Sequence, residues 1–147
     1  MTRKLIDSLH VEAMVLSDEA RSYFDGFGMS ERMQLAPRTR VILSCEALKV
    51  TTRLMHSVAW LLSRRAQLDH RADLLRSLGL ATPSESEMIA DLPEEARRLI
   101  TASVDLYTRI DRLASGLSEP VSCAESPAFH LQQQLERSLS AAHHVSA

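Results

Sequence analysis

The stretch LKVTTRLMHSVAWLLSRRA, residues 48–66, decides the fold, because its side chains are apolar around most of a helical circumference. Pro37 stands upstream of it, and proline is favoured in the first turn of a helix. The helical pattern continues from Pro37 to about Asp69. The sequence therefore predicts one helix of about 45–50 Å, at 1.5 Å per residue.

Two adjoining apolar stripes run along this predicted helix when its residues are spaced at 100°. The first stripe contains Val41, Cys45, Leu48, Thr52, Met55, Ala59, Leu62 and Ala66. The second stripe contains Leu43, Ala47, Val50, Leu54, Val58 and Leu61. Because a surface helix usually has one stripe only somewhat wider than 100°, we expect two sets of partners. These are the other helices of the chain and a second copy of it, with the second stripe in the core or in the dimer contact.

A shorter helix is predicted on either side of the long one. Apolar residues recur at helical spacing from Leu5 to Phe24, and the glycines of YFDGFG predict a tight loop after them. The segment DLPEEARRLI predicts a helix capped by Asp91, with Pro93 in its first turn and Gly116 as its end. Before this helix, ATPSESEM has the composition of a polar linker with turns.

The predicted architecture is all-α: an antiparallel three-helix bundle in up-down-up order, with a long central helix and a flexible or short-helical C-terminal tail. We expect the bundle in residues 1–117 and the tail in residues 118–147. Within the tail, FHLQQQLERSLSAA has the pattern of a short helix, which is marginally stable in isolation.

Composition and charge narrow the class of protein. A net charge of −2 with 24% charged residues lacks the concentrated positive charge typical of a nucleic-acid binder. No apolar run approaches the roughly 20 residues of a membrane span, and the N-terminal segment lacks the apolar core of a signal peptide. Cys45 and Cys123 form no metal or redox motif, which fits a reducing compartment. We therefore expect a cytoplasmic protein.

Catalytic and cofactor-binding patterns are missing from the sequence. Asp7 is the only carboxylate three residues before a histidine, His10, and one such pair cannot build a di-iron site. There is no His-Glu-x-x-His, no Cys-x-x-Cys and no glycine-rich phosphate loop after a strand. We expect no enzyme activity, no metal and no cofactor.

Trp60, the only tryptophan of the chain, falls on the narrow polar arc of the long helix. The same arc holds Lys49, Arg53 and Arg64. Two interpretations are open. In the first, Trp60 packs beneath the linker or the tail, and the arginines are solvated with their stems over apolar rings. In the second, the four residues form a protein-interaction hot spot, for which Trp and Arg are among the most enriched residue types.

The loop YFDGFG and the stretch CEALKVTTRLMHSVAWLLSRRA resemble an alphaproteobacterial family that includes the regulator of CtrA degradation. A weaker match is LPEEARRLITASVDLYTRIDRL, residues 92–113. The resemblance implies a homodimeric three-helix bundle with a flexible tail. It also implies a non-enzymatic adaptor that works with other regulators to bring a client transcription regulator to the ClpXP protease in cell-cycle control. The motif positions are Tyr23, Asp25, Gly26, Thr51, Thr52 and Arg65.

Other functions compete with this adaptor. A DNA-associated or other protein-binding regulator on the same scaffold would use the arginines of the long helix, but these are divided between its polar and apolar faces. An enzyme on a helical bundle would need a nucleophile–base pair or a metal cluster. Residues 70–91 and the tail do not match the family's pattern, so the resemblance does not identify the clients.

Overall fold

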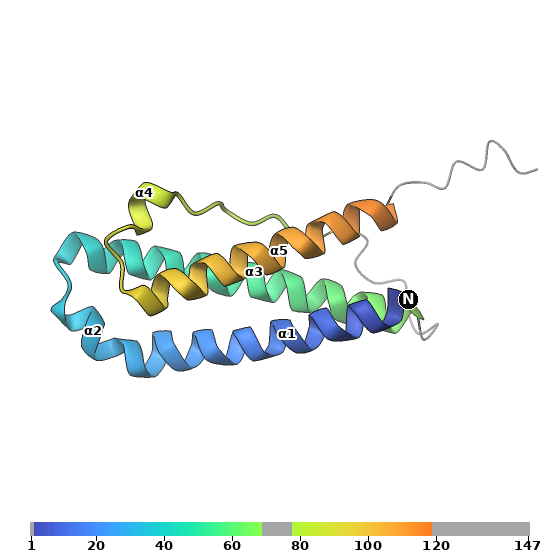
Figure 1. Cartoon of the computed structure of the whole chain (residues 1–147), viewed down its shortest axis with the longest axis horizontal. Helices are drawn as coiled ribbons and strands as arrows, with labels where there is room; N and C mark the ends of the chain where they lie inside the picture. Colours follow the sequence, from blue (N-terminus) through green and yellow to red (C-terminus); the bar gives the residue numbers. More distant parts are fainter. Residues whose placement is uncertain (1, 69–77, 119–147) are drawn as a thin grey trace, which may run out of the picture. The chain divides into compact units, whose positions relative to one another are not determined.

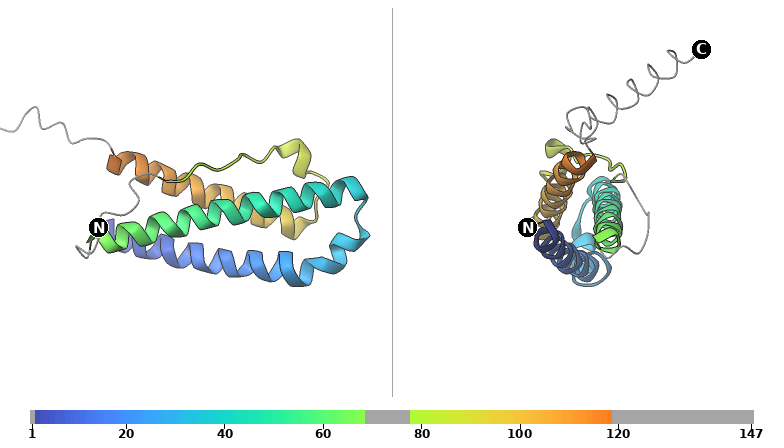
Figure 2. Two further views of the ribbon diagram at one scale, coloured as in Figure 1. Left: turned by 180° about the vertical axis from the view of Figure 1, so that it is seen from behind. Right: turned by 90° about the vertical axis from the view of Figure 1, so that its right-hand side faces the viewer.

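The computed structural model describes residues 2–68 and 78–118 of the chain. Its helices are α1 (Thr2–Ser22), α2 (Gly28–Gln34), α3 (Pro37–Leu68), α4 (Ser86–Ile89) and α5 (Glu94–Ser118), and a π-helical turn, η1 (Tyr23–Phe27), joins α1 to α2. Seen end-on, the three long helices α1, α3 and α5 occupy the corners of a triangle (Figure 2). This arrangement confirms the predicted all-α three-helix bundle.

The bundle lies in the first compact unit of the chain, Met1–Gly116. The predicted tail, residues 118–147, lies outside the described residues apart from Ser118. The division of the chain into residues 1–117 and a tail therefore stays a prediction.

The long helix α3 extends over Pro37–Leu68, and its predicted end at Asp69 lies outside the described residues. Its second apolar stripe faces the interior of the chain's own bundle. In this stripe four residues are buried and two are half-buried: Leu43, Val50, Leu54 and Leu61, then Ala47 and Val58. The core continues across Ile6, Leu9 and Ala13 of α1 and across Leu99, Ile100 and Leu106 of α5.

The segment YFDGFG continues the helix instead of forming the predicted tight loop. Tyr23–Phe27 makes a π-helical turn that leads directly into α2. A Cβ atom at Gly28 would lie 2.7 Å from the carbonyl oxygen of Tyr23 and 2.9 Å from its ring atom Cζ. Glycine is therefore required at position 28 by close packing, since its φ of −74° is open to any residue. Gly26 faces open space.

The directions of the helices differ from the predicted up-down-up order. α1 runs antiparallel to α3 and α5, whereas α5 runs in the same direction as α3 (Figure 1). The ion pairs of Arg98 with Glu19 and of Arg109 with Glu12 agree with this, because position along α5 rises as position along α1 falls. The reason is that residues 78–85, which we call the strap, carry the chain back along the bundle before α5 begins (Figure 1).

The structure differs from the predictions in the linker before α5 and at both ends of α5. The predicted linker contains one helical turn, α4, and the amide of Leu92 donates to the carbonyl of Ile89 at 3.1 Å. The first hydrogen bond of α5 runs from the amide of Arg97 to the carbonyl of Pro93, so Asp91 precedes the helix and does not cap it. Gly116 lies within α5, where a glycine costs about 1 kcal/mol but does not end a helix by itself.

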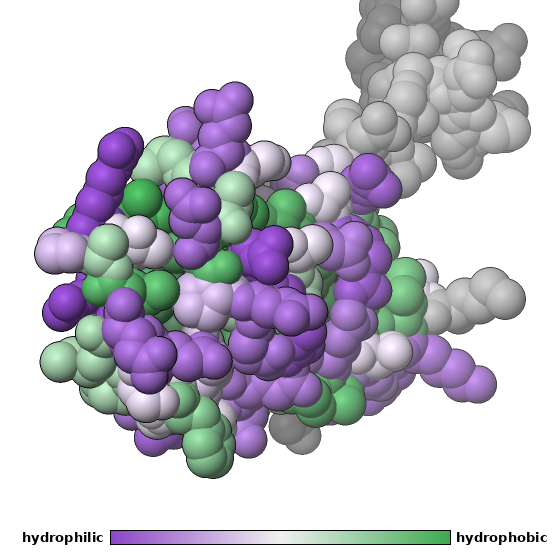
Figure 3. All heavy atoms as spheres, turned by 60° about the vertical axis from the view of Figure 1, so that its left-hand side comes forward, coloured by the Kyte–Doolittle hydropathy of each residue, from purple (hydrophilic) through white to green (hydrophobic). Residues whose placement is uncertain are grey.

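The first apolar stripe of α3 stays on the surface of the bundle. Its four large side chains are between 48% and 69% exposed: Val41, Leu48, Met55 and Leu62. Apolar side chains also reach the surface between polar ones on the face shown in Figure 3.

Candidate functional site

The polar arc of α3 is covered by the strap and by α5, and Arg53 is the residue that joins all three. Only 2% of Arg53 is exposed. Its guanidinium donates to the carbonyl oxygen of Thr82 at 2.8 Å, to Oγ of Ser84 at 2.7 Å and to Oγ of Ser103 at 3.2 Å. One side chain therefore attaches the strap to α3 and α5.

Glu46 supplies the negative charge of this network. It is as deeply buried as Arg53, and it accepts hydrogen bonds from Nζ of Lys49 at 2.7 Å and from the hydroxyl of Ser84. Burial lowers the pKa of the Arg53 guanidinium, and the carboxylate of Glu46 opposes that effect. A buried charge is tolerated when it is paired and hydrogen-bonded, and this network meets both conditions.

Trp60 lies in the core with none of its surface exposed. The guanidinium carbon of Arg64 stands 5.1 Å from the centre of its ring, which is cation–π distance. Leu78 at the start of the strap packs against the same core. Trp60 is therefore a core residue, but the interpretation that accompanied such packing, in which the arginines are solvated, is wrong for Arg53, which is buried.

The interaction role of Lys49, Arg53, Trp60 and Arg64 stays a prediction. A partner could not contact all four side chains directly in this structure, because Arg53 and Trp60 are buried and Lys49 and Arg64 are half-buried. The strap is hydrogen-bonded to Arg53, so a partner would reach its guanidinium only by displacing the strap.

The strap has a second attachment near its start. The hydroxyl of Tyr107 donates to the carbonyl oxygen of Gly79 at 2.6 Å. A Cβ atom at Gly79 would lie 2.7 Å from the imidazole ring of His56, so glycine permits the strap to pass close over α3. Burial raises the pKa of Tyr107.

The family-motif residue Tyr23 is buried at the junction of α1 and η1. Its hydroxyl donates to a carboxylate oxygen of Glu31 at 2.7 Å. Burial raises the pKa of Tyr23, and the negative charge of Glu31 adds to the effect. Sequence reasoning missed Glu31 and Gly28, because their meeting with Tyr23 depends on the π-helical turn between them. Asp25 and Gly26 are exposed.

The other motif residues make contacts of ordinary structural kinds. The hydroxyls of Thr51 and Thr52 donate to the carbonyl oxygens of Ala47 and Leu48 within α3, both at 2.9 Å. Arg65 pairs with Asp7 of α1 at 2.9 Å. Arg53 and Arg65 of α3 are thus engaged with other parts of the chain.

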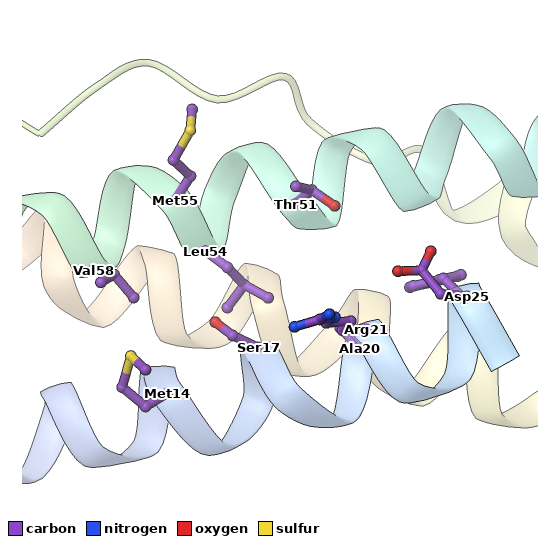
Figure 4. Close-up of a pocket in the computed structure, with 10 residues that line it drawn as sticks. Met14, Ser17, Ala20, Arg21, Asp25, Thr51, Leu54, Met55 and Val58 are labelled. Atoms are coloured by element: carbon purple, nitrogen blue, oxygen red, sulfur yellow. The ribbon is translucent and has the colours of Figure 1, made fainter. Parts of the chain in front are cut away.

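A groove of about 460 Å³ lies between α1 and α3, as Figure 4 shows. Ten residues line it: Met14, Ser17, Ala20, Arg21, Phe24 and Asp25 on one side, and Thr51, Leu54, Met55 and Val58 on the other. The groove could not be predicted from the sequence, because it forms only where α1 and α3 pack side by side.

Over residues 2–68 and 78–118, no group of three or more His, Cys, Asp or Glu side chains is arranged to hold a metal ion. In the same ranges, no helix is long and apolar enough to cross a membrane.

The fold and these surfaces define a helical scaffold with a buried polar network and exposed apolar faces. The chain belongs to the family described as "Protein of unknown function (DUF1465)", whose model matches residues 1–141. Among solved structures, RcdA from Caulobacter crescentus CB15 is similar: it is 28% identical, with a TM-score of 0.66 over 84% of this chain and 95% of that chain. No curated protein matches the chain. These matches confirm the family suggested by the sequence motifs.

Proposed function

We propose that this chain is a non-enzymatic adaptor in regulated proteolysis. The observation that carries the proposal is the likeness to RcdA, a regulator of CtrA degradation, over most of both chains. The chain would act in the cytoplasm, where it would help to deliver a client transcription regulator to the ClpXP protease during the cell cycle. Co-adaptor proteins would be further partners.

An adaptor of this kind works by holding two proteins together. Tethering raises the effective concentration of the client at the protease, so modest affinity at each contact is sufficient. The bundle would provide one contact and residues 118–147 the other. This division of labour predicts that the tail is needed for delivery and not for folding of the bundle.

We also propose that the first stripe of α3 joins two copies of the chain. From Val41 to Ala66 its residues are spaced alternately by four and three, which is the heptad pattern of a coiled coil. Large side chains alternate with small ones: Val41, Leu48, Met55 and Leu62 with Cys45, Thr52, Ala59 and Ala66. The exposure of the large ones supports a partner helix along this seam, because burying apolar surface is favourable by about 25 cal/mol per Å².

The adaptor proposal is tested by following the degradation of purified CtrA by ClpXP and ATP, with co-adaptors present. The full chain should increase the initial rate of client loss. A form ending at Ser118, the last residue of α5, should not, although its circular dichroism should still show the folded bundle. A ClpXP substrate that needs no adaptor serves as the control for protease activity. If the full chain leaves the rate of CtrA loss unchanged, the proposal that it delivers CtrA to ClpXP is wrong.

A further inference from the structure

The groove between α1 and α3 is an apolar surface that the bundle leaves open. Ala20, Leu54 and Val58 contribute its apolar floor, and Met14 and Met55 are exposed at its edges. In Figure 4 the side chains of Met14 and Ser17 from α1 and of Leu54 from α3 lie in the space between the two helices, whereas Met55 points away from α1. A concave apolar surface with a few polar groups is the usual form of a binding site.

Arg21 places a guanidinium at the groove that pairs directly with no carboxylate of the described residues. In Figure 4 its side chain extends between the two helices. Over the described residues it makes no ion pair or hydrogen bond, whereas Arg98 and Arg109 of α5 pair with carboxylates of α1. Asp25 lines the groove one helical turn away and makes no ion pair in the described ranges either. The groove therefore matches a ligand with a carboxylate that faces Arg21 and a cation, one helical turn away, that faces Asp25.

The walls of the groove favour a helix as this ligand. No strand occurs in the described parts of the chain, so there is no sheet edge to which an extended peptide could add its backbone hydrogen bonds. A helix satisfies its own backbone and needs only an apolar stripe to fill a groove between two other helices. The flexible thioethers of Met14 and Met55 can adjust to stripes of different shape.

We infer that this groove binds an amphipathic helix of a partner protein, with an acidic residue beside its apolar stripe. The apolar side chains lie against Met14, Leu54 and Val58, and the carboxylate faces Arg21. The inference rests on the proposed adaptor function, in which the bound helix belongs to a client.

The methionines of the chain provide the test. The full chain, labelled with ¹³C at its methionine methyl groups, is titrated with two synthetic amphipathic helices of about five turns. Both carry the same leucine stripe, and the residue beside it is Glu in one and Lys in the other. The acidic helix should shift the NMR signal of Met14, which lines the groove and lies outside the proposed dimer seam. Met29, Met33 and Met88 lie outside the groove and should not shift.

Charge reversal tests the role of Arg21. Arg21→Glu should weaken binding of the acidic helix about tenfold or more, and it should favour the basic helix, because charge-assisted hydrogen bonds are strong. Arg38→Glu is the matched control, since Arg38 is exposed and does not line the groove. That variant should bind both helices as the parent chain does.

Three results would overturn the inference. The first is no shift of Met14 with either helix. The second is binding that Arg21→Glu leaves unchanged. The third is a shift of Met14 that follows the concentration of the chain alone, since a second copy would then occupy the groove. If the helix binds in the groove but the chain does not speed client degradation, the adaptor proposal is wrong and the groove inference stands. If the chain speeds client degradation but the helix does not bind, only the groove inference is wrong.

Discussion

Trp60 and Arg53 are buried although both lie on the polar arc of α3. A helical wheel shows which face carries polar residues, but it does not show what covers that face. Here the strap supplies the acceptors that Arg53 needs, namely the carbonyl of Thr82 and the hydroxyl of Ser84. At the scale of residues, the polar arc is therefore an attachment site for the chain's own backbone.

The burial of Trp60 predicts a large loss of stability when its ring is removed. Trp60→Ala should lower the free energy of unfolding by about 3–5 kcal/mol, because a cavity is left in the core. Phe27→Ala is the control, since Phe27 is 85% exposed and its loss should change stability by less than about 0.5 kcal/mol. Urea denaturation measures both values. Equal effects of the two variants would contradict the core position of Trp60.

Tyr23 predicts a loss of stability at alkaline pH. Burial raises its pKa in the folded chain above the ordinary value near 10, so the folded state binds its proton more tightly than the unfolded state does. The stability that this provides is complete below about pH 10 and is lost as the pH rises further. Tyr23→Phe should therefore have a smaller alkaline decrease in the free energy of unfolding than the parent chain.

The measurement is urea denaturation at a series of pH values on both sides of the tyrosine pKa. Tyr107 also has a raised pKa, so part of the alkaline decrease should remain in Tyr23→Phe. If the parent chain and the variant lost stability in parallel, the proton held by Tyr23 would have no part in it.

At the scale of elements, the π-helical turn η1 decides how α1 passes into α2. It brings Gly28 against Tyr23, and it places Glu31 at the hydroxyl of the same residue. The glycines of YFDGFG indicated an interruption here, but their spacing did not distinguish a loop from a wider helical turn. The packing of Tyr23 against Gly28 and its hydrogen bond to Glu31 favour the π-helical turn.

The two glycines of this turn should respond differently to substitution. Gly28→Ala should destabilise the chain by about 1–3 kcal/mol, because the new methyl group would meet the backbone of Tyr23, which cannot easily move. Gly26→Ala should be nearly neutral, since nothing lies within 4 Å of the added atom. Differential scanning calorimetry of the two variants gives the comparison. A higher Tm for Gly28→Ala than for Gly26→Ala would be the opposite of what this packing requires.

The strap is the element that sets the direction of α5. Its residues return along the bundle, and Arg53, Tyr107 and the close passage of Gly79 over His56 hold them there. Short connections favour antiparallel neighbours, which is why up-down-up order was expected. Because the strap runs back along the bundle before α5 begins, α5 can lie parallel to α3.

At the scale of the whole molecule, the exposed seam of α3 makes assembly testable. Leu48→Asp should reduce self-association, because it would place a charge in an apolar contact. Leu80→Asp is the control: Leu80 is 91% exposed and lies on the strap, not on α3. Sedimentation equilibrium should show dimers for the parent chain and the control, and monomers for Leu48→Asp.

Thermal unfolding provides a second readout of the same prediction. The Tm of a dimer rises with protein concentration, whereas the Tm of a monomer does not. The parent chain and Leu80→Asp should show that dependence, and Leu48→Asp should lose it. A parent chain that sediments as a monomer at every concentration would rule out the seam as a dimer contact.

Periodicity in the sequence was sufficient to predict the long helix of α3, its two apolar stripes and the three-helix bundle. These features depend on residues that are close in the chain, and a helix of 3.6 residues per turn translates spacing directly into a face. Periodicity did not predict the parallel direction of α5, the burial of Trp60 and Arg53, or the groove beside Arg21. These three features depend on which segment of the chain packs on each face of a helix, and that packing is determined by contacts between residues distant in the sequence. Only the tertiary structure contains them.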